Sequence, residues 1–113
     1  MSTTSDYEAF VAQFEQACER HARADAERKR LEDIGKIAFS HMASQFINEG
    51  MAIAKAEHRA RCSDYVIEKV KELAEAQLEA NLAYATIKSM ELRFEMFRSR
   101  NANRRAEMNL GRV

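Results

Sequence analysis

The sequence predicts an all-α fold, and three observations lead to that prediction. The 113 residues contain no Pro and only three Gly, so the turn residues that separate β-strands are almost absent. Apolar residues recur at alternating steps of three and four along two long stretches, which is the spacing of one face of an α-helix. We therefore expect a single domain over residues 1–113, an antiparallel helical hairpin with residues 1–4 and 109–113 as frayed tails.

The first long helix is expected over about residues 5–47. Ser5 and Glu8 have the spacing of a capping box, which would start this helix. Gly35 costs about 1 kcal/mol relative to Ala inside a helix, but the apolar pattern keeps its phase there, so we expect a bend at most. Gly50 suits the left-handed conformation that follows a helix end. The apolar face comprises Tyr7, Phe10, Phe14, Ala17, His21, Ala24, Leu31, Ile34, Ala38, Met42 and Phe46.

A short connector helix (about 52–61) and a second long helix (about 64–107) follow, with Ser63 as the N-cap of the second. Folding about the connector places residue i near about residue 111 − i, to within one turn. Phe14 would then contact Phe97, in an aromatic layer that closes the far end of the hairpin. The apolar face of the second helix comprises Val66, Val70, Leu73, Ala80, Tyr84, Ile87, Phe94 and Phe97.

Two helices alone leave apolar residues uncovered. The second long helix has a further apolar row, rotated away from the first, and the end of the first helix is apolar on most sides. A helix that is apolar all round is normally buried all round. The surplus predicts a homodimer that forms a four-helix bundle, and a site for a foreign protein is the alternative. The residues concerned are Leu78, Leu82, Leu92, Met96, Ile37 and Ile47.

The sequence gives no support for catalysis or for a bound cofactor. Cys18, His21, His58 and Cys62 are a zinc-type ligand set, but His21 lies about 40 Å from the connector at helical rise, so one ion cannot bridge them. The same distance excludes a disulfide between the two cysteines. Phosphate-binding glycine loops and nucleophile–base motifs are absent from the sequence. We expect no enzyme, no metal and no cofactor.

The charge balance and the N-terminal sequence indicate the location of the protein and limit its possible partners. Eighteen acidic and eighteen basic residues give no net charge, so the molecule as a whole is not built for polyanions. The first residues lack the features of a signal peptide, and no window is apolar enough to span a membrane. The two Cys are expected to be free thiols in a reducing compartment. These features predict a cytoplasmic protein that does not enter membranes.

The C-terminal segment is rich in Arg. Residues 93–113 contain six Arg against Glu95 and Glu107, a surplus of four positive charges, whereas residues 64–92 carry six acids and three bases. Arg suits phosphates and carboxylates equally. These side chains would contact nucleic acid or an acidic protein, or would stabilise the helix end and pair with Glu8, Glu15 and Glu19. The candidate contacts are Arg93, Arg98, Arg100, Arg104 and Arg105.

The segment over residues 90–108 resembles the end of small helical accessory proteins that tailed phages and prophages encode. The resemblance rests on the run from Met90 to Ser99 and its continuation from Arg104 to Met108, and Tyr7, Glu8 and Phe10 reinforce it. It implies a viral or mobile-element context and supplies no activity or functional residue. We therefore expect a phage accessory protein that binds or inhibits a host protein in the host cytoplasm. The alternative is a nucleic-acid-associated accessory of phage recombination or replication.

Overall fold

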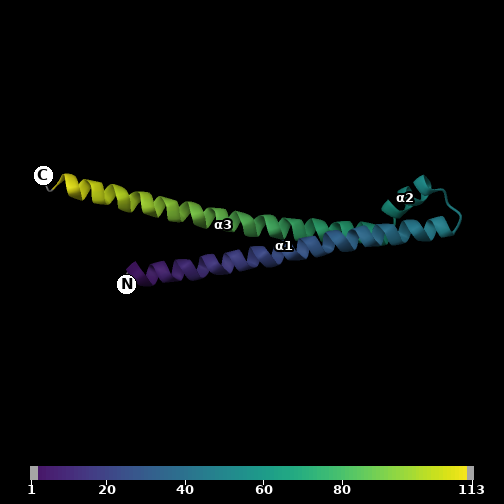
Figure 1. Cartoon of the computed structure of the whole chain (residues 1–113), viewed down its shortest axis with the longest axis horizontal. Helices are drawn as coiled ribbons and strands as arrows, with labels where there is room; N and C mark the ends of the chain where they lie inside the picture. The colour runs from purple at the N-terminus through teal and green to yellow at the C-terminus, as the bar shows by residue number, and fades with distance from the viewer. Residues whose placement is uncertain (1–2, 112–113) are drawn as a thin grey trace.

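The computed structural model describes residues 3–111, which form three helices in one elongated hairpin (Figure 1). The helices are α1 (Thr3–Asn48), α2 (Ile53–Arg61) and α3 (Asp64–Leu110). α1 and α3 run antiparallel in a rod of 88 × 24 × 15 Å. The predicted all-α hairpin is therefore confirmed.

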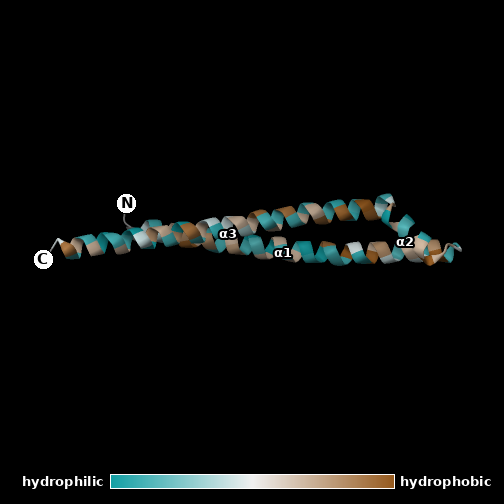
Figure 2. Ribbon diagram, turned by 90° about the horizontal axis from the view of Figure 1, so that it is seen from above, coloured by the Kyte–Doolittle hydropathy of each residue, from teal (hydrophilic) through white to brown (hydrophobic). Residues whose placement is uncertain are grey.

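The two long helices have mixed surfaces. Figure 2 shows hydrophobic turns alternating with hydrophilic ones along both α1 and α3. In keeping with this pattern, none of the helices in residues 3–111 has the length and apolar character needed to cross a membrane.

The start of α1 differs from the prediction. α1 begins at Thr3, so Ser5 lies inside the helix rather than at its N-cap. Gly35 does not interrupt α1, as expected from the unbroken apolar pattern. Of the predicted frayed tails, residues 3–4 and 109–110 are helical, and residues 1–2 and 112–113 lie outside the described part of the chain.

The connector follows the predicted turn chemistry. Gly50 has a φ of 98°, the left-handed conformation in which a side chain would be strained. Ser63 is the N-cap of α3: its Oγ accepts a hydrogen bond from the Val66 amide at 3.4 Å and donates one to the Ala60 carbonyl at 2.7 Å. These two residues end α1 and begin α3 where the sequence predicts.

The pairing of α1 with α3 differs from the prediction by two helical turns. The rings of Phe10 and Phe94 stack at 6.0 Å, and Ala17 packs with Ile87; in both pairs the residue numbers add up to 104 rather than 111. The predicted contact between Phe14 and Phe97 is therefore wrong, because Phe14 packs against the cluster of Ala17, Ile87 and Met90.

The direction of α2 explains this shift. α2 runs back along the last turns of α1, and the guanidinium groups of Arg59 and Arg61 lie 5.0 and 5.2 Å from the ring centres of Phe46 and Phe39. α3 therefore begins beside α1, about two turns before the end of α1, rather than beyond that end (Figure 1). The sequence-based pairing ignored the length that α2 takes up in doubling back.

The side chains between the two long helices follow a heptad repeat. Val66, Leu73, Ala80, Ile87 and Phe94 recur every seven residues in α3, and a second set interleaves with them at Lys69, Ala76, Ala83 and Met90; each of these residues is buried or half-buried. This is the pattern of a two-stranded antiparallel coiled coil. Val70 and Tyr84, which were expected in the core, are 61% and 50% exposed because Lys69 and Ala83 occupy the core positions beside them.

The core is thin and follows the seam between the helices. At the connector end, where α2 covers α1 and α3 begins, the buried residues are Ala38, Ala43, Ala56, Ala60 and Val66. At the open end, where the two chain ends lie, Phe10, Phe14 and Cys18 pack against Ala17, Ile87 and Met90. Between these two regions Ala80 and Ala83 are buried, and the half-buried Arg28 is hydrogen-bonded to Asp25 and Glu32, each at 3.1 Å.

Candidate interaction surfaces

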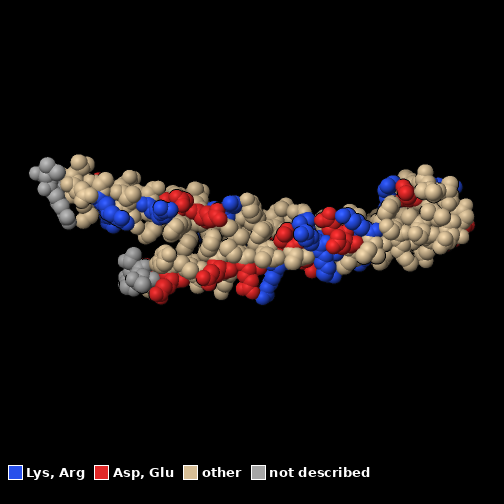
Figure 3. All heavy atoms as spheres, in the orientation of Figure 1, with Lys and Arg blue, Asp and Glu red and all other residues tan. Residues whose placement is uncertain are grey.

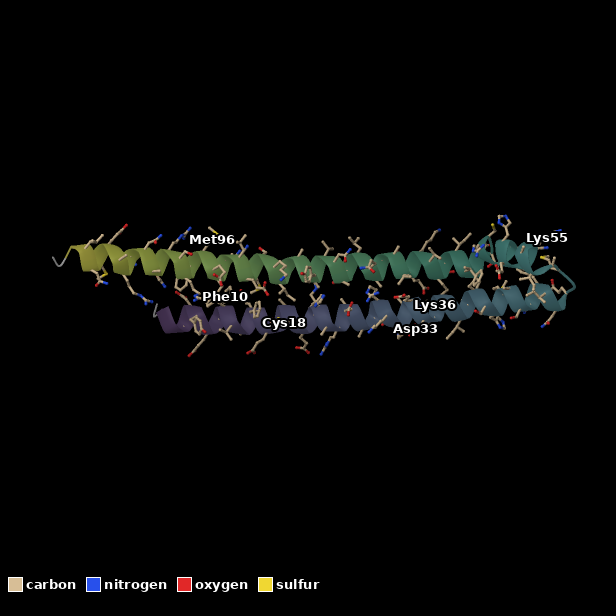
Figure 4. The ribbon with its side chains drawn as sticks, turned by 45° about the horizontal axis from the view of Figure 1, so that its top comes forward. Phe10, Cys18, Asp33, Lys36, Lys55 and Met96 are labelled. Carbon is tan, nitrogen blue, oxygen red and sulfur yellow. The ribbon has the colours of Figure 1, made fainter. Side chains whose placement is uncertain are left out.

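An aromatic cleft lies between α1 and α3 at the open end. Tyr7, Phe10, Phe94 and Phe97 line it, with Asp6, Arg93 and Asn101 around them. Phe10 points into the space between the two helices in Figure 4. Because only two helices meet here, Tyr7 and Phe97 remain about half exposed. The predicted aromatic layer is present, but it leaves the end of the hairpin open.

α3 extends past the described part of α1. Since facing residue numbers add up to 104, Asn101 lies level with Thr3, the first described residue of α1. Beyond Asn101, α3 continues without an α1 neighbour among the described residues (Figure 1), and residues 102–110 are here called the overhang. A shallow hollow follows the base of the overhang, lined by Phe97, Arg100, Asn101, Asn103, Arg104 and Glu107.

The five candidate arginines do not form one patch. Arg93 and Arg100 lie seven residues apart along one side of α3, and Arg98 and Arg105 lie seven apart along the other side. Arg104 continues the line of core positions into the overhang. The Arg-rich segment therefore presents two rows of charge that flank the direction of α1.

Their ion pairs also differ from the expectation. Arg98 pairs with Glu95 of its own helix at 3.5 Å, and its guanidinium lies 6.0 Å from the centre of the Phe94 ring. Ion pairs from Arg93 or Arg98 to Glu8, Glu15 or Glu19 are not formed. The other four arginines have no carboxylate of residues 5–111 within ion-pair distance.

The open end is divided by charge. Between residues 5 and 19, α1 carries Asp6, Glu8, Glu15 and Glu19 and no basic residue. Figure 3 shows acidic side chains along the α1 branch, and basic side chains with some acidic ones beside them on the α3 branch. A partner that covers the cleft thus meets positive charge on one side and negative charge on the other.

The six residues of the predicted apolar stripe are all exposed, at 40–68% of their surface. They fall into two groups. Ile37 and Ile47 lie on α1 in its connector half, so they do not continue the row on α3. Met96, in the row on α3, points away from α1 in Figure 4, and Leu82, Ala85 and Ser89 border a hollow beside α1. We call this row the outer row: Leu78, Leu82, Ala85, Ser89, Leu92 and Met96.

The cysteine and histidine residues lie in different parts of the rod. Cys18 packs in the open-end core, and the His21 ring lies 5.6 Å from the Tyr84 ring. Cys62 is exposed beside α2, with its Sγ 4.0 Å from Nε2 of His58. Both thiols are free, and the described residues bring no group of three potential metal ligands together.

Charged pairs along the exposed helix faces shift a few pKa values. A hydrogen bond from Arg30 lowers the pKa of Glu27, and the same bond raises the pKa of Arg30. A hydrogen bond to Glu91 raises the pKa of Lys88, to which Tyr84 also contributes. Each hydrogen bond joins residues three apart on one helix, so these shifts reflect helix-surface pairing.

Comparison of this chain with models of protein families, with curated proteins and with solved structures finds no match. Sequence reasoning found the arginines and the aromatic residues but missed the overhang. The sequence signal for the overhang is the pair Ala56 and Ala60, two small residues four apart on one face of α2. They are fully buried because α2 lies flat on α1, and this moves the start of α3 back along α1.

Proposed function

We propose that this chain is a non-enzymatic protein-interaction module that binds its partner at the open end. The observation that carries this proposal is the half-exposed aromatic cleft next to arginines that have no carboxylate partner in residues 5–111. Tyr, Phe, Met and Arg are the side chains enriched in protein interfaces, and energetically important contacts cluster around aromatic anchors. The cleft offers such an anchor site, and the arginines offer charge-assisted hydrogen bonds around it.

The chemistry of the cleft favours a protein partner of mixed charge. Asp6 lines the cleft together with Arg93, and the acidic face of α1 continues directly from it. A phosphate backbone laid across the cleft would be repelled by this face. A protein segment with an apolar anchor, acidic residues towards the overhang and basic residues towards α1 would match all three parts.

The biological setting is part of the same proposal. The resemblance of residues 90–108 to phage accessory proteins supports a role in which the module binds or inhibits a host protein. The free thiols Cys18 and Cys62 support a reducing compartment, in line with a cytoplasmic location.

Site-specific photo-crosslinking in the cells that make this protein tests this proposal. A photoreactive phenylalanine analogue at Phe97 should give one discrete protein adduct, and the same analogue at Lys29, on the middle of the rod, should give none. The adduct should weaken when Arg98, Arg104 and Arg105 are all replaced by Ala. Equal labelling at both positions, or an adduct that does not depend on the arginines, would contradict the proposal.

A second candidate function is binding of nucleic acid by the overhang. Arg100, Arg104 and Arg105, together with Asn101 and Asn103, favour it, and Phe97 offers an exposed ring on which a base could stack. Fluorescence anisotropy with single- and double-stranded DNA over a salt series tests this function. Affinity should fall as salt rises, and should fall further in a variant with Arg100, Arg104 and Arg105 changed to Ala. No binding at low salt would exclude it.

A further inference from the structure

α3 carries two apolar rows on opposite sides. The inner row packs against α1, and the outer row spans residues 78–96 and is exposed. Successive members of the outer row are separated by four, three, four, three and four residues, so the row follows its own heptad repeat. A row with this spacing is suited to pack against another helix in the same way that the inner row packs against α1.

The outer row is symmetrical in chemistry when it is read from its centre. From one end to the other it runs large, large, small, small, large, large. Beside an antiparallel copy of itself, Leu78 would face Met96, Leu82 would face Leu92, and Ala85 would face Ser89. We infer that the outer row of α3 binds the outer row of a second copy of this chain, with α3 antiparallel to α3 and a twofold axis level with Ile87.

Charges beside the outer row support this partner and this direction. Glu72, Glu79, Arg93 and Arg100 lie in one line beside the row at intervals of seven or fourteen residues. In the antiparallel arrangement, Glu79 faces Arg93 of the second copy and Glu72 faces its Arg100, and each contact occurs twice. Glu79 already accepts a hydrogen bond from Arg20 at 2.6 Å, so it would lie between two guanidinium groups.

The charge of the whole helix agrees with this direction. Residues 64–92 carry three surplus negative charges, and residues 93–113 carry four surplus positive charges. A parallel pair would place like charges together along its length, whereas the antiparallel pair places each acidic segment beside a basic one. Lys88 is the exception because it approaches its own copy near the axis, but its Nζ is held by Glu91 at 3.2 Å.

The surface is large enough for a stable dimer. α3 runs from Asp64 to Leu110, two ends that are equally distant from Ile87, so the antiparallel copies overlap along their full length. The outer row itself is about 27 Å long, and polar residues of α3 extend the contact on both sides of it. With these residues included, a contact about 70 Å long and about 10 Å wide would bury on the order of 1,400 Å² over the two copies, within the range of specific interfaces. The outer row lies on the other side of α3 from the cleft, and of the dimer contacts named above only Arg93 also lines the cleft, so the inference goes beyond the proposed function without depending on it.

A pair of matched substitutions tests the surface. Sedimentation equilibrium of the full chain should show a dimer at micromolar concentration. Leu92→Glu places a charge against an apolar layer twice per dimer and should weaken dimerisation at least about tenfold. Val70→Glu is the control, because Val70 is as exposed as Leu92 and lies on the same helix but outside the outer row. A monomeric chain, or equal loss in the two variants, would overturn the inference.

Charge exchange tests the antiparallel direction. Glu79→Arg alone brings Arg against Arg93, and Arg93→Glu alone brings Glu against Glu79, so each variant should dimerise about tenfold more weakly. An equimolar mixture should recover the dimer, because every contact between the two different chains again joins opposite charges. A mixture that stays as weak as its components would overturn this pairing. Circular dichroism confirms that each variant remains helical, and photo-crosslinking at Phe97 reports on the proposed function separately.

Discussion

The two ends of the hairpin differ in how completely they bury their side chains. At the connector end, three helices meet, and the residues buried between them are small: Ala38, Ala43, Ala56, Ala60 and Val66. At the open end, only two helices meet, and the residues between them are large rings, such as Phe10, Phe14 and Phe94, that stay partly exposed. The small side chains are covered completely, whereas the large ones are not.

This difference separates stability from recognition. Three helices with Ala between them approach closely and leave little room for change. Two helices cannot surround an aromatic ring, so each ring at the open end retains surface that a partner can cover. The same chain thus has its most completely buried side chains at one end and an exposed aromatic surface at the other.

The largest expected effect is at the connector end. Ala60→Leu inserts three carbon atoms where the native side chain is fully buried, and we expect it to lower the free energy of unfolding by about 3 kcal/mol. Urea unfolding followed by circular dichroism measures this change. Ala22→Leu, on an exposed face of α1, should be nearly neutral. Equal effects of the two substitutions would remove the distinction between the ends.

At the open end, the loss of a ring should matter less than its size suggests. Phe94→Ala removes a half-buried ring that stacks on Phe10, and we expect a loss of about 2 kcal/mol rather than the larger loss of a fully buried Phe. Phe97→Ala, at a ring that is about half exposed, should lose less than half of that amount. The same unfolding experiment compares them, and a larger loss for Phe97→Ala would contradict the described pairing.

Replacing Gly50 or Gly35 by Ala should change the stability of the hairpin in opposite directions. Gly50→Ala places a side chain on backbone with a φ of 98° and should cost about 1 kcal/mol. Gly35→Ala lies inside α1 with open space around the added carbon, so it should stabilise the hairpin by about 0.5–1 kcal/mol. Thermal unfolding of both variants at one protein concentration gives the signs. A loss of stability in Gly35→Ala would contradict the open space around Gly35.

The smallest effect concerns an exposed ion pair of α1 in the middle of the rod. The folded-state pKa of Glu27 is lowered by Arg30, so its contribution is present above the ordinary carboxyl pKa and is lost as the pH falls through the lowered value. Glu27→Gln should therefore melt at a slightly lower temperature than the native chain near neutral pH. The difference should vanish in acid. Melting temperatures over a pH series, with Lys29→Gln as a control, measure it.

The sequence predicted the helices well because their signals are local. The apolar repeat, Gly50 and Ser63 each act over a few residues, and the observed ends of the helices lie within three residues of the predicted ones. Only the capping box at Ser5 is wrong, because α1 begins at Thr3.

The pairing of the helices could not be predicted in the same way. It depends on α2 folding back over Phe39 and Phe46, which no local pattern states. For the same reason the overhang was missed, although each of its arginines was named. Residue type alone favours Val70 over Lys69 as a core residue. The seven-residue spacing decides which positions face α1, however, and it places Lys69 there and leaves Val70 exposed.

The fold-back of α2 also has a consequence for the order in which the hairpin forms. Residues such as Phe46 and Arg59 are close in sequence, so their contact closes a short loop, whereas Phe10 and Phe94 must close a loop of most of the chain. Folding is therefore expected to start at the connector and to proceed towards the termini. The aromatic cleft would be the last part to form and the first to open. A partner that fills the cleft would hold the two helices together at the open end and would slow the unfolding of the whole rod.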